Sequence, residues 1–566
     1  MSSDAIVPVL IVGGGPTALA TALTLTKNNI PVRIIQKDEH YHRGQRGAGI
    51  QVFPFPFPAK HSHNRYVQPR TLEYYNLLGV LPDILERGIP VVPIRIYKLP
   101  GGTEPIKTFP MVEFEENTPA IPHNMPHLLG QANQEAVMRE HLEKLGVRVE
   151  LNTEFLSYEQ HEDGVVAHLV RQLGEEKIPE TVRCDWLVGA DGARSVVRKQ
   201  LGVTFLGETH SEHLIFGEIE VKGLSSDYWH VWGTLGGTLV VLRPTETEGL
   251  FWFVVGGSID HAKFMTDHDA VIQYMRDYTE RTDFEFGKVR FISDFRPNVR
   301  MVDKFGVERV FLAGDAAHGL NTGVQDGVNL GWKLALVIKN YASPSLLSTY
   351  TTERLPVVAH MLKMTTALFQ KTRASTIDGH GAEQAWTRGG AVKQLGINYR
   401  WSPIVRDERT PYVRPADTEQ LEVYGAEGGD TSVLRAGDRA PDAPGLVNSR
   451  QPDAEPTKLF SIFGVTYHTV LIFSSDAAQI RAVLDTVKEY PPNTVKTVAI
   501  HPQGTSTVTA FEDADYVVTD RDGYAYNGYN VADPASTTIV IARPDGVVGG
   551  IVFTVDGMHK FFQAYH

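Results

Sequence analysis

The chain has 566 residues, with 54 Lys and Arg against 67 Asp and Glu, so its formal net charge at pH 7 is −13. At 42% hydrophobic and 21% charged residues it is a folded chain of two or three domains, which excludes wholesale disorder. The acidic balance argues against nucleic-acid binding and a polybasic membrane anchor. The single cysteine, Cys184, excludes internal disulfides, a redox pair and a metal site of several cysteines, so we expect a reducing, cytoplasmic location.

The first predicted elements are a strand, a glycine-rich turn and a helix. The apolar run 7–12 is followed by Gly13-Gly14-Gly15-Pro16-Thr17-Ala18 and a helical pattern over 19–27. Glycines at such a place let the backbone approach a pyrophosphate, whose charge the helix N-terminus stabilises. The same glycines and the proline argue against a membrane span over 5–26. With Ala18 in the third glycine position, the turn alone is equally compatible with simple packing.

A second strand over 32–35 ends at Gln36. The end of this strand usually carries a carboxylate that binds the ribose hydroxyls of a dinucleotide. Gln36 can still form a hydrogen bond there, but it adds no charge.

Two later segments also combine a buried strand with a turn that contains aspartate. In the first, Gly189-Ala190-Asp191-Gly192 follows a strand, and in the second a strand ends at Gly314-Asp315. Taken singly, each aspartate could simply cap a helix. Together with the opening turn, the segments resemble the three signatures of the single-component FAD-dependent aromatic hydroxylases, the family of para-hydroxybenzoate hydroxylase and phenol hydroxylase.

The resemblance implies a Rossmann-like FAD-binding domain. The first turn would hold the FAD pyrophosphate, the Asp-Gly segment would lie where flavin and nicotinamide pass, and the later aspartate would bind the flavin ribitol. The matching cofactor positions are Gly13, Gly15, Ala18, Gln36, Arg46, Gln131, Asp191, Gly192, Gly314, Asp315, Leu320 and Asn321. For Gln131 the alternative is an exposed residue at a helix start, and for Arg46 a solvated arginine. No second glycine fingerprint follows a strand, so NADH or NADPH would dock transiently in a groove.

The helix pattern over 320–338 has one apolar face, and the resemblance places its start beside the flavin. Asn321 can cap it, and its N–H groups would stabilise negative charge on the reduced flavin. Relatives join His318 to this helix through a loop of about eight residues, but here Gly319 and Leu320 follow at once. At about 3.3 to 3.6 Å per extended residue, about 26 to 29 Å of reach is lost, which puts the position of the helix start in doubt.

An insertion is the second departure. Relatives would join Gln51 directly to Pro69, whereas residues 52–68, rich in Phe and Pro, intervene here. The codons of this segment have the length and the ends of a small unspliced intron read in frame. We therefore hypothesise that both departures are splicing artefacts of a eukaryotic gene, with a natural surface loop as the alternative for the insertion.

Between about 203 and 300, short alternating runs predict an antiparallel sheet with one face over the flavin. Tyr228 and His230 share strand parity and could bind or deprotonate a phenol, which is more nucleophilic as the phenolate. The aspartate that serves as base in phenol hydroxylases corresponds to Ala48, so His230 is the replacement candidate. Its alternative role is that of a hydrogen-bonded sheet histidine. Arg243 is a candidate for binding a carboxylate on the substrate.

We expect three parts: an FAD-binding domain over 1–375 with the inserted substrate sheet, a connector over 376–435 and a C-terminal domain over 436–566. In the last, apolar strands at 469–473 and 538–542 flank a helix at 477–489. Followed by Arg543-Pro544-Asp545-Gly546, they resemble the thioredoxin-like C-terminal domain of phenol hydroxylases. This domain contains no cysteine, so a redox role is excluded, and packing and homodimer formation remain.

The leading interpretation is an α/β FAD-dependent monooxygenase that hydroxylates a phenolic or hydroxybenzoate-like aromatic with NADH or NADPH and O2. By resemblance, the nicotinamide reduces FAD, and oxygen then adds to the flavin before its transfer to the ring. Oxidative decarboxylation at a ring carbon bearing a carboxyl group is one alternative. A flavin-binding or inactive splice variant without turnover is the other, as the shortened loop would suggest.

Overall fold

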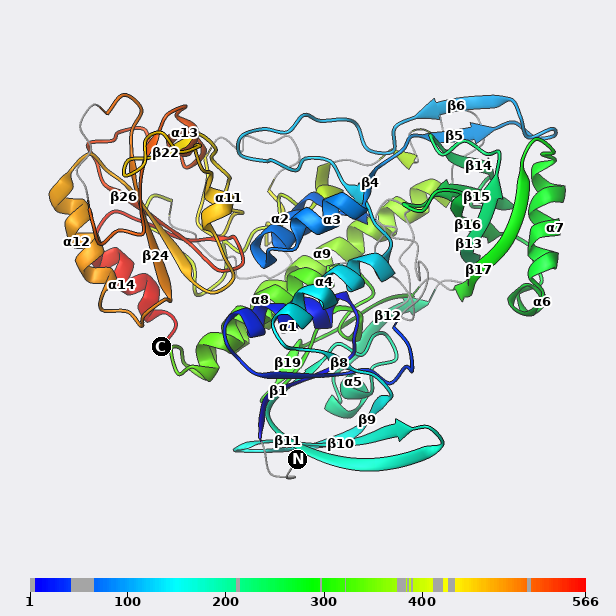
Figure 1. The fold of residues 1–566 in the computed structure, drawn as a ribbon, viewed down its shortest axis with the longest axis horizontal. Coiled ribbons are helices and arrows are strands. Elements are labelled where there is room, and N and C mark those ends of the chain that lie inside the picture. Colours follow the sequence, from blue (N-terminus) through cyan, green and yellow to red (C-terminus); the bar gives the residue numbers. More distant parts are fainter. Residues whose placement is uncertain are drawn as a thin grey trace.

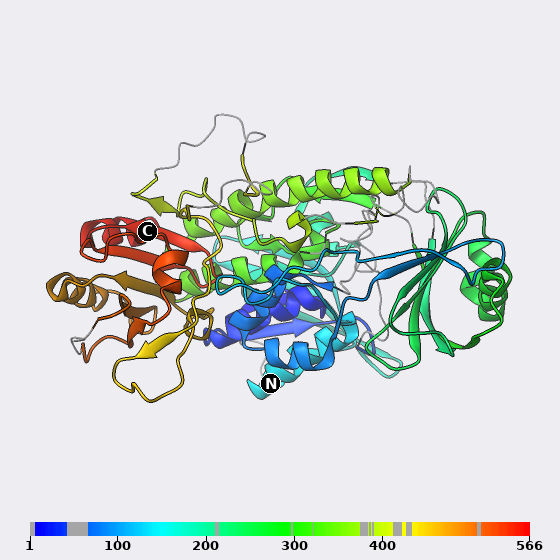
Figure 2. The same cartoon turned by 90° about the horizontal axis from the view of Figure 1, so that it is seen from above.

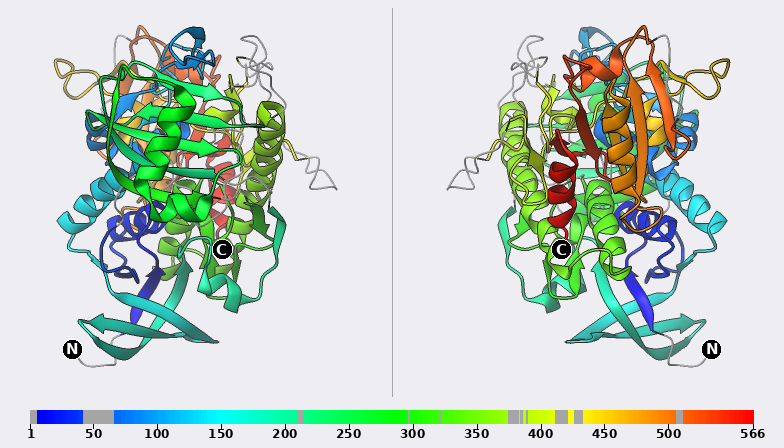
Figure 3. Two further views of the ribbon diagram at one scale, coloured as in Figure 1. Left: turned by 90° about the vertical axis from the view of Figure 1, so that its right-hand side faces the viewer. Right: turned by 90° about the vertical axis from the view of Figure 1, so that its left-hand side faces the viewer.

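The computed structural model describes residues 6–41, 66–209, 214–295, 298–320, 322–373, 383, 386–387, 390–410, 421–425, 433–505 and 511–566. Over these residues the chain forms three parts that lie in a row (Figures 1 and 2). The end-on views of Figure 3 place a second sheet at one end of the row and the C-terminal part at the other. None of the helices in these ranges combines the length and apolar character that a membrane span requires.

The middle part is built on a sheet whose central strands are parallel. Its strands, in sheet order, are β19 (Gly306–Val307), β20 (Val310–Leu312), β11 (Glu176–Gly189), β1 (Val7–Val12), β2 (Val32–Ile35) and β8 (Val149–Glu150). The long β11 continues beyond the sheet into an antiparallel ribbon with β10 (Gly164–Leu173) and β9 (Thr153–His161). The Rossmann-like α/β arrangement is confirmed, with the predicted strands at 7–12 and 32–35 in place.

Helices surround this sheet. They are α1 (Pro16–Lys27), α2 (Pro69–Leu78), α3 (Leu81–Arg87), α4 (Gln131–Lys144), α5 (Val196–Leu201), α8 (Gly323–Ile338) and α9 (Ser348–Arg373), with short 3-10 helices at Gly314–Ala316, Pro344–Leu347 and Gly390–Lys393. Glycines let α1 and α8 pack closely: a Cβ on Gly327 would lie 2.8 Å from the Thr17 carbonyl oxygen, and one on Gly331 would lie 2.8 Å from Thr24 Cβ. This contact brings the starts of α1 and α8 together.

The second sheet is antiparallel apart from one pair of strands. Its strands, in order, are β17 (Glu285–Phe295), β13 (Leu214–Lys222), β16 (Leu250–Gly256), β15 (Leu239–Pro244), β14 (Trp229–Gly233), β5 (Ile94–Tyr97) and β6 (Pro105–Phe109). The expected region 203–300 therefore supplies five of these strands, and β5, which runs parallel to β14, and β6 come from an earlier segment. Two helices, α6 (His261–Thr266) and α7 (His268–Thr279), cover its outer face (Figure 1).

The two faces of this sheet belong to different apolar clusters. Trp232 packs in one cluster with Val271 and Met275 of α7. Trp229 and Trp252 pack in the other, together with side chains from outside the sheet such as Leu128. Because successive side chains of a strand point to opposite faces, the parity of a residue decides whether it meets α7 or the middle part of the molecule.

Two small sheets connect these parts. β12 (Phe205–Thr209) pairs with β18 (Asn298–Val302), while β3 (Tyr66–Val67) and β4 (Ile89–Pro90) both pair with β7 (His127–Leu128). Residues 52–65 of the insertion lie outside the described residues. The end of the insertion, Val67 and Gln68, is buried directly before α2. Its origin as an unspliced intron stays a hypothesis.

The C-terminal part has a seven-stranded sheet. Its strands, in order, are β21 (Arg406–Asp407), β27 (Val548–Val552), β26 (Thr538–Ala542), β23 (His468–Phe473), β24 (Val495–His501), β25 (Tyr516–Asp520) and β22 (Leu446–Asn448). Its helices are α11 (Leu459–Ile462), α12 (Ala477–Val487), α13 (Tyr524–Gly528) and α14 (Val555–Gln563). β23 runs parallel to β24 and antiparallel to β26, and the hairpin β26–β27 leads into α14. The thioredoxin-like assignment stays a prediction.

Candidate functional site

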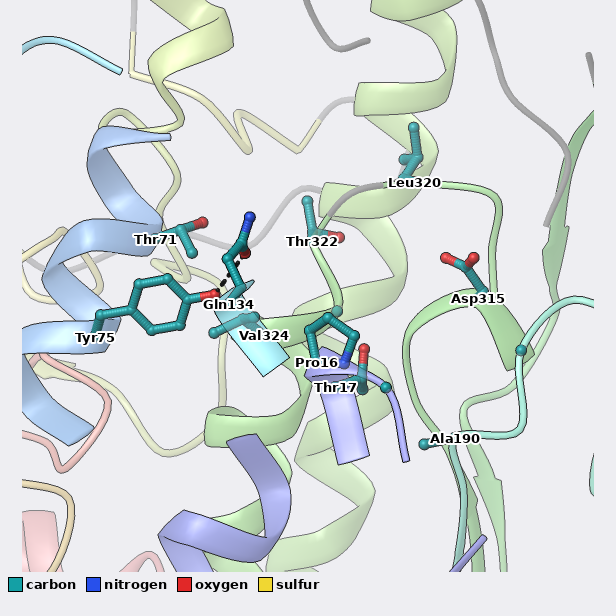
Figure 4. A pocket seen from close by; sticks show the side chains of 13 residues that line it. Pro16, Thr17, Thr71, Tyr75, Gln134, Ala190, Asp315, Leu320, Thr322 and Val324 are labelled. Carbon is teal, nitrogen blue, oxygen red and sulfur yellow. Dashed lines mark hydrogen bonds between the residues drawn. The ribbon is translucent and has the colours of Figure 1, made fainter. Parts of the chain in front are cut away.

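The three sequence motifs meet at one cavity in the middle part, whose empty space is about 590 Å³ including its opening to solvent. Figure 4 shows that its walls come from the starts of α1 and α8, from α2 and α4, and from the turns after β11 and β20. The lining residues are Gly15, Pro16, Thr17, Thr71, Tyr75, Gln134, Ala190, Gly192, Asp315, Leu320, Thr322, Gly323 and Val324. The structure thus brings together segments that are far apart in the sequence.

The glycine turn after β1 is shaped for close approach to a ligand. Gly13 has φ +116°, and a Cβ there would lie 2.2 Å from the carbonyl oxygen of Ala190. A Cβ on Gly15 would meet no atom within 4 Å, so this glycine faces open space at the start of α1. Ala18, in the third glycine position, is buried in the core. The turn therefore leaves room for a pyrophosphate at a helix N-terminus.

Gln36 holds this turn from the side. Its Oε1 accepts a hydrogen bond from the Gly14 N–H at 2.9 Å, and its Nε2 donates to Asp38 Oδ2 at 2.5 Å. Both ends of the amide thus form hydrogen bonds within the chain and fix the turn, and its contact with a ribose stays a prediction. The sequence analysis missed Asp38, which brings a carboxylate close to the position where other dinucleotide folds have one.

Asp191 caps a helix in the structure. Its Oδ2 accepts hydrogen bonds from the N–H groups of Val196 at 2.7 Å and Val197 at 3.3 Å, at the start of α5. Burial raises the pKa of the Asp191 carboxyl. Gly192 has φ +75°, which favours glycine, and it lines the cavity. The capping alternative thus describes what Asp191 does within the chain, and its flavin role stays a prediction.

The second aspartate motif and the start of α8 lie against α1. A Cβ on Gly314 would be 2.3 Å from Thr17 Oγ1, and one on Gly323 would be 2.1 Å from the same oxygen. Asp315 and Leu320 line the cavity on this side (Figure 4). Despite the shortened loop, the start of α8 therefore reaches the cavity, which removes the doubt about its position. Asn321 and Arg46 lie outside the described residues, and Thr322 occupies the position before the helix.

A buried polar network supports this corner. Asp326 Oδ2 accepts hydrogen bonds from the Gly314 N–H at 3.0 Å and from His318 Nε2 at 2.7 Å, and Asp326 Oδ1 accepts one from Arg354 Nε at 2.7 Å. His318 Nδ1 in turn accepts the N–H of Leu320 at 3.2 Å. Burial acts to raise the pKa of Asp326, but Arg354 and His318 outweigh it and hold the pKa below its usual range. The sequence analysis missed this network, whose only signal was an aspartate within an apolar helix.

Three of the buried polar atoms that have no hydrogen-bond partner among the described residues belong to the segments around this cavity: Asp191 Oδ1, Gln131 Oε1 and Thr322 Oγ1. Gln131 and Thr322 are each 1% exposed, so Gln131 is not the exposed residue of the alternative interpretation. An unpaired polar group in the interior is costly unless a ligand or water satisfies it. FAD presents hydroxyl, carbonyl and N–H groups that would do so. The glycine cradle and these polar atoms therefore fit that cofactor.

The predicted base His230 points away from this cavity. Its ring packs beside those of Tyr97 and Trp232 on the α7 face of the sheet, with Nδ1 2.8 Å from the Tyr97 hydroxyl and Nε2 2.8 Å from the Ser225 carbonyl oxygen. Burial lowers its pKa to about 4. Tyr228 contacts the edge of the same ring and the guanidinium of Arg95. We therefore correct the expectation: the geometry is that of a hydrogen-bonded sheet histidine, because parity turns both residues to the outer face.

Arg243 lies on the opposite face. It is 2% exposed, and its guanidinium carbon lies 5.5 Å from the centre of the Trp229 ring and 5.6 Å from that of Trp252. Arg243 lies on β15, and just beyond the end of this strand is Glu246. Glu246 accepts hydrogen bonds from the Gly130 N–H at 3.0 Å and from Asn133 Nδ2 at 2.6 Å, at the start of α4. These bonds tie the Arg243 end of the sheet to the middle part of the molecule.

Comparisons with known proteins agree with this geometry. A family model described as an FAD binding domain matches residues 57–365. A flavin-dependent monooxygenase of Mycobacteroides abscessus is 33% identical, with 96% of each chain covered. Pentachlorophenol 4-monooxygenase of Sphingobium chlorophenolicum is 26% identical over 97% of this chain and 94% of its own. The crystal structure of the flavin-dependent monooxygenase PieE with FAD and substrate shares the fold, with a TM-score of 0.77, 20% identity, and 100% and 99% coverage.

Proposed function

The chain belongs to the class A FAD-dependent aromatic hydroxylases, and from this premise we propose that it hydroxylates a phenolic or hydroxybenzoate-like compound with NADH or NADPH and O2. The observation that carries the proposal is the cavity where the three motifs meet, with its glycine cradle and unsatisfied buried polar atoms. Bound FAD, once reduced by the nicotinamide, supplies the activation of oxygen for transfer to an electron-rich ring.

The residues of the cavity would divide the work of holding FAD. Gly13 and Gly15 admit the pyrophosphate to the start of α1, whose dipole stabilises its charge. Asp315 binds ribitol hydroxyls. The first N–H groups of α8, together with the Thr322 hydroxyl, would bind the pyrimidine side of the flavin and would stabilise negative charge there on reduction. Gln131 and the Asp191 segment complete the contacts.

The substrate would lie between this cavity and the inner face of the second sheet. Arg243 would be the anion-binding group in this placement, because it is a buried cation beside two tryptophan rings on the face that meets the middle part. An aromatic ring bearing a carboxylate or a phenolate complements both the rings and the charge. With His230 on the other face, no base is assigned from the described residues.

A titration of purified protein with FAD tests the first step, because a bound flavin has visible absorbance and altered fluorescence. The second step is the oxidation of NADH and of NADPH with a panel of phenols, with and without a carboxylate, followed together with oxygen consumption and product mass. The expected result is tight FAD uptake and a product that gains one oxygen atom. Folded protein that stays colourless with excess FAD would contradict the proposal. FAD uptake without substrate-dependent turnover would favour the alternative function, in which the chain binds flavin but does not catalyse hydroxylation.

A further inference from the structure

A turn of the C-terminal part reaches into the middle part. Residues Arg543, Pro544, Asp545 and Gly546, here called the 543–546 turn, join β26 to β27. Arg543 donates to both oxygens of Glu353 on α9, at 2.7 and 2.9 Å, and also to Asp545 Oδ1 and Oδ2, at 3.0 and 2.5 Å. Arg543, Asp545 and Glu353 are all fully buried. This ionic contact therefore ties two parts of the chain together where no water reaches.

The turn holds α8 through Asn329. The Asn329 Nδ2 group donates to Asp545 Oδ2 at 3.1 Å and to Glu353 Oε2 at 2.8 Å. Lys333, one helical turn further along α8, donates to Glu353 Oε2 at 2.8 Å and to Asn329 Oδ1 at 2.9 Å. Two cations and two carboxylates balance in this cluster. Asn329 lies about 10 Å along the helix axis from Thr322, which lines the cavity.

The same turn holds α2. Arg70 Nη2 donates to the carbonyl oxygens of Asp545 at 3.2 Å and Gly546 at 3.3 Å, while Arg70 Nη1 pairs with Glu73 at 2.6 Å. Gly546 has φ +68°, and a Cβ there would lie 3.1 Å from Leu77 Cδ1 of α2, so the turn approaches this helix closely. On the same helix, Thr71 is next to Arg70 and Tyr75 follows one turn later, and both of these residues line the cavity.

We propose that the 543–546 turn is a positioning element of the FAD cavity: it fixes α2 and α8, two walls of that cavity, relative to each other. The inference rests on the proposed function, because it takes the cavity to be the FAD site. It gives the C-terminal part, which has no cysteine for redox chemistry, a role in shaping the flavin environment. Arg543 and Asp545 act through the helices and touch no cofactor or substrate.

The test uses variants that loosen either link without changing the charge of the cluster. Asn329→Leu removes the link to α8 with a neutral side chain of similar size, and Arg70→Lys keeps the cation beside Glu73 but loses the reach to both carbonyls. We expect the FAD dissociation constant of each full-length variant to rise about tenfold or more, with shifted absorption maxima of the bound flavin. The control is Ile480→Val on α12, which is buried on the far side of the C-terminal sheet (Figure 1).

Ile480→Val should lower the unfolding midpoint yet leave the FAD dissociation constant within about twofold of wild type. If folded Asn329→Leu and Arg70→Lys bind FAD with the wild-type constant and spectrum, the positioning role is refuted. An equal loss of affinity in Ile480→Val would also overturn it, because general destabilisation would then be sufficient. Wild-type protein that takes up no FAD would refute the proposed function itself, a result distinct from variants that bind as well as wild type.

Hydrogen exchange on the wild-type chain keeps the inference testable if a variant does not fold. The amide N–H of Gly546 donates to the Arg543 carbonyl oxygen at 3.0 Å, and the amide N–H of Arg543 donates to that of Val547 at 2.8 Å. The turn does not line the cavity, but FAD binding should slow exchange at these amides because it rigidifies α2 and α8. Unchanged exchange at the turn on FAD binding would refute the inference.

Discussion

The flavin cavity and the second sheet present their chemistry in different ways. The cavity is formed mainly by backbone and small residues, and its charge-stabilising groups are helix starts, so its properties follow from where the chain turns. The sheet has two aromatic faces of similar composition, and only one of them meets the middle part. A site formed by backbone therefore tolerates little added side-chain volume. A site formed by side chains depends instead on strand parity and on the residues that pack against each face.

The largest effect is expected at the glycine turn. Gly13→Val places atoms where even a Cβ would lie 2.2 Å from the Ala190 oxygen, at φ +116°. FAD affinity should fall by at least about 100-fold, because the turn must move away from its ligand position. Fluorescence titration with FAD measures this. Gly174→Ala is the control, since it also places a side chain at a positive φ, +62°, but a Cβ there meets no atom within 4 Å. Equal FAD affinity in Gly13→Val and wild type would refute the assignment of the cavity.

The next effect concerns the inner face of the sheet. Arg243→Met should raise KM for a carboxylate-bearing aromatic about 30-fold, because a buried anion would lose its cation, and should change KM for a neutral phenol much less. Steady-state kinetics with a matched pair of substrates measures the difference. The control is Arg95→Met. The guanidinium of Arg95 covers the Tyr228 ring on the outer face of the sheet, so its loss should change neither KM. Equal effects of Arg243→Met on both substrates would remove the anion-binding role.

The outer face yields a prediction about pH. Burial lowers the pKa of folded His230 to about 4, below the ordinary value of 6.5. The unfolded chain therefore takes up this proton first, and stability is lost as pH falls from 6.5 towards 4, by about 2 kcal/mol at pH 5. Urea unfolding at pH 7 and at pH 5 measures this loss of stability, and the loss should be smaller in His230→Asn than in wild type.

The pH profile of hydroxylation supplies the contrast. In His230→Asn it should keep the wild-type shape, since the ring faces α7. A changed profile would restore His230 as a base and break the distinction between the two faces.

The smallest effect is expected at the start of α8. Thr322→Val removes a buried hydroxyl that has no hydrogen-bond partner among the described residues, in a side chain of nearly the same shape. FAD affinity should fall about fivefold, the value of one hydrogen bond, while stability stays within about 0.5 kcal/mol of wild type. Calorimetric titration and thermal unfolding measure the two quantities. A fall in stability with unchanged affinity would mean that the hydroxyl serves the fold and not the ligand.

Much of the fold and of the cavity follows from contiguous segments. The glycine turn at Gly13 and Gly15, the strand at 7–12 and the Gly314-Asp315 turn were predictable because short motifs fix their own backbone. The position of α8 was not, since the length of the connecting loop says nothing of the glycine contacts at Gly327 and Gly331 that bring this helix against α1. The network around Asp326 was also missed, because its partner Arg354 is distant in sequence.

The sequence by itself determined a flavin-binding α/β chain, because the turns that admit a dinucleotide need glycine and aspartate at set places along one strand–turn–helix segment. Only the tertiary structure decided which face of the second sheet meets the middle part, and so separated Arg243 from His230. It also decided that Arg543 and Asp545 contact α8 and α9 in a balanced buried cluster. The physical reason is that parity and periodicity define faces, whereas the packing of distant segments decides what each face meets.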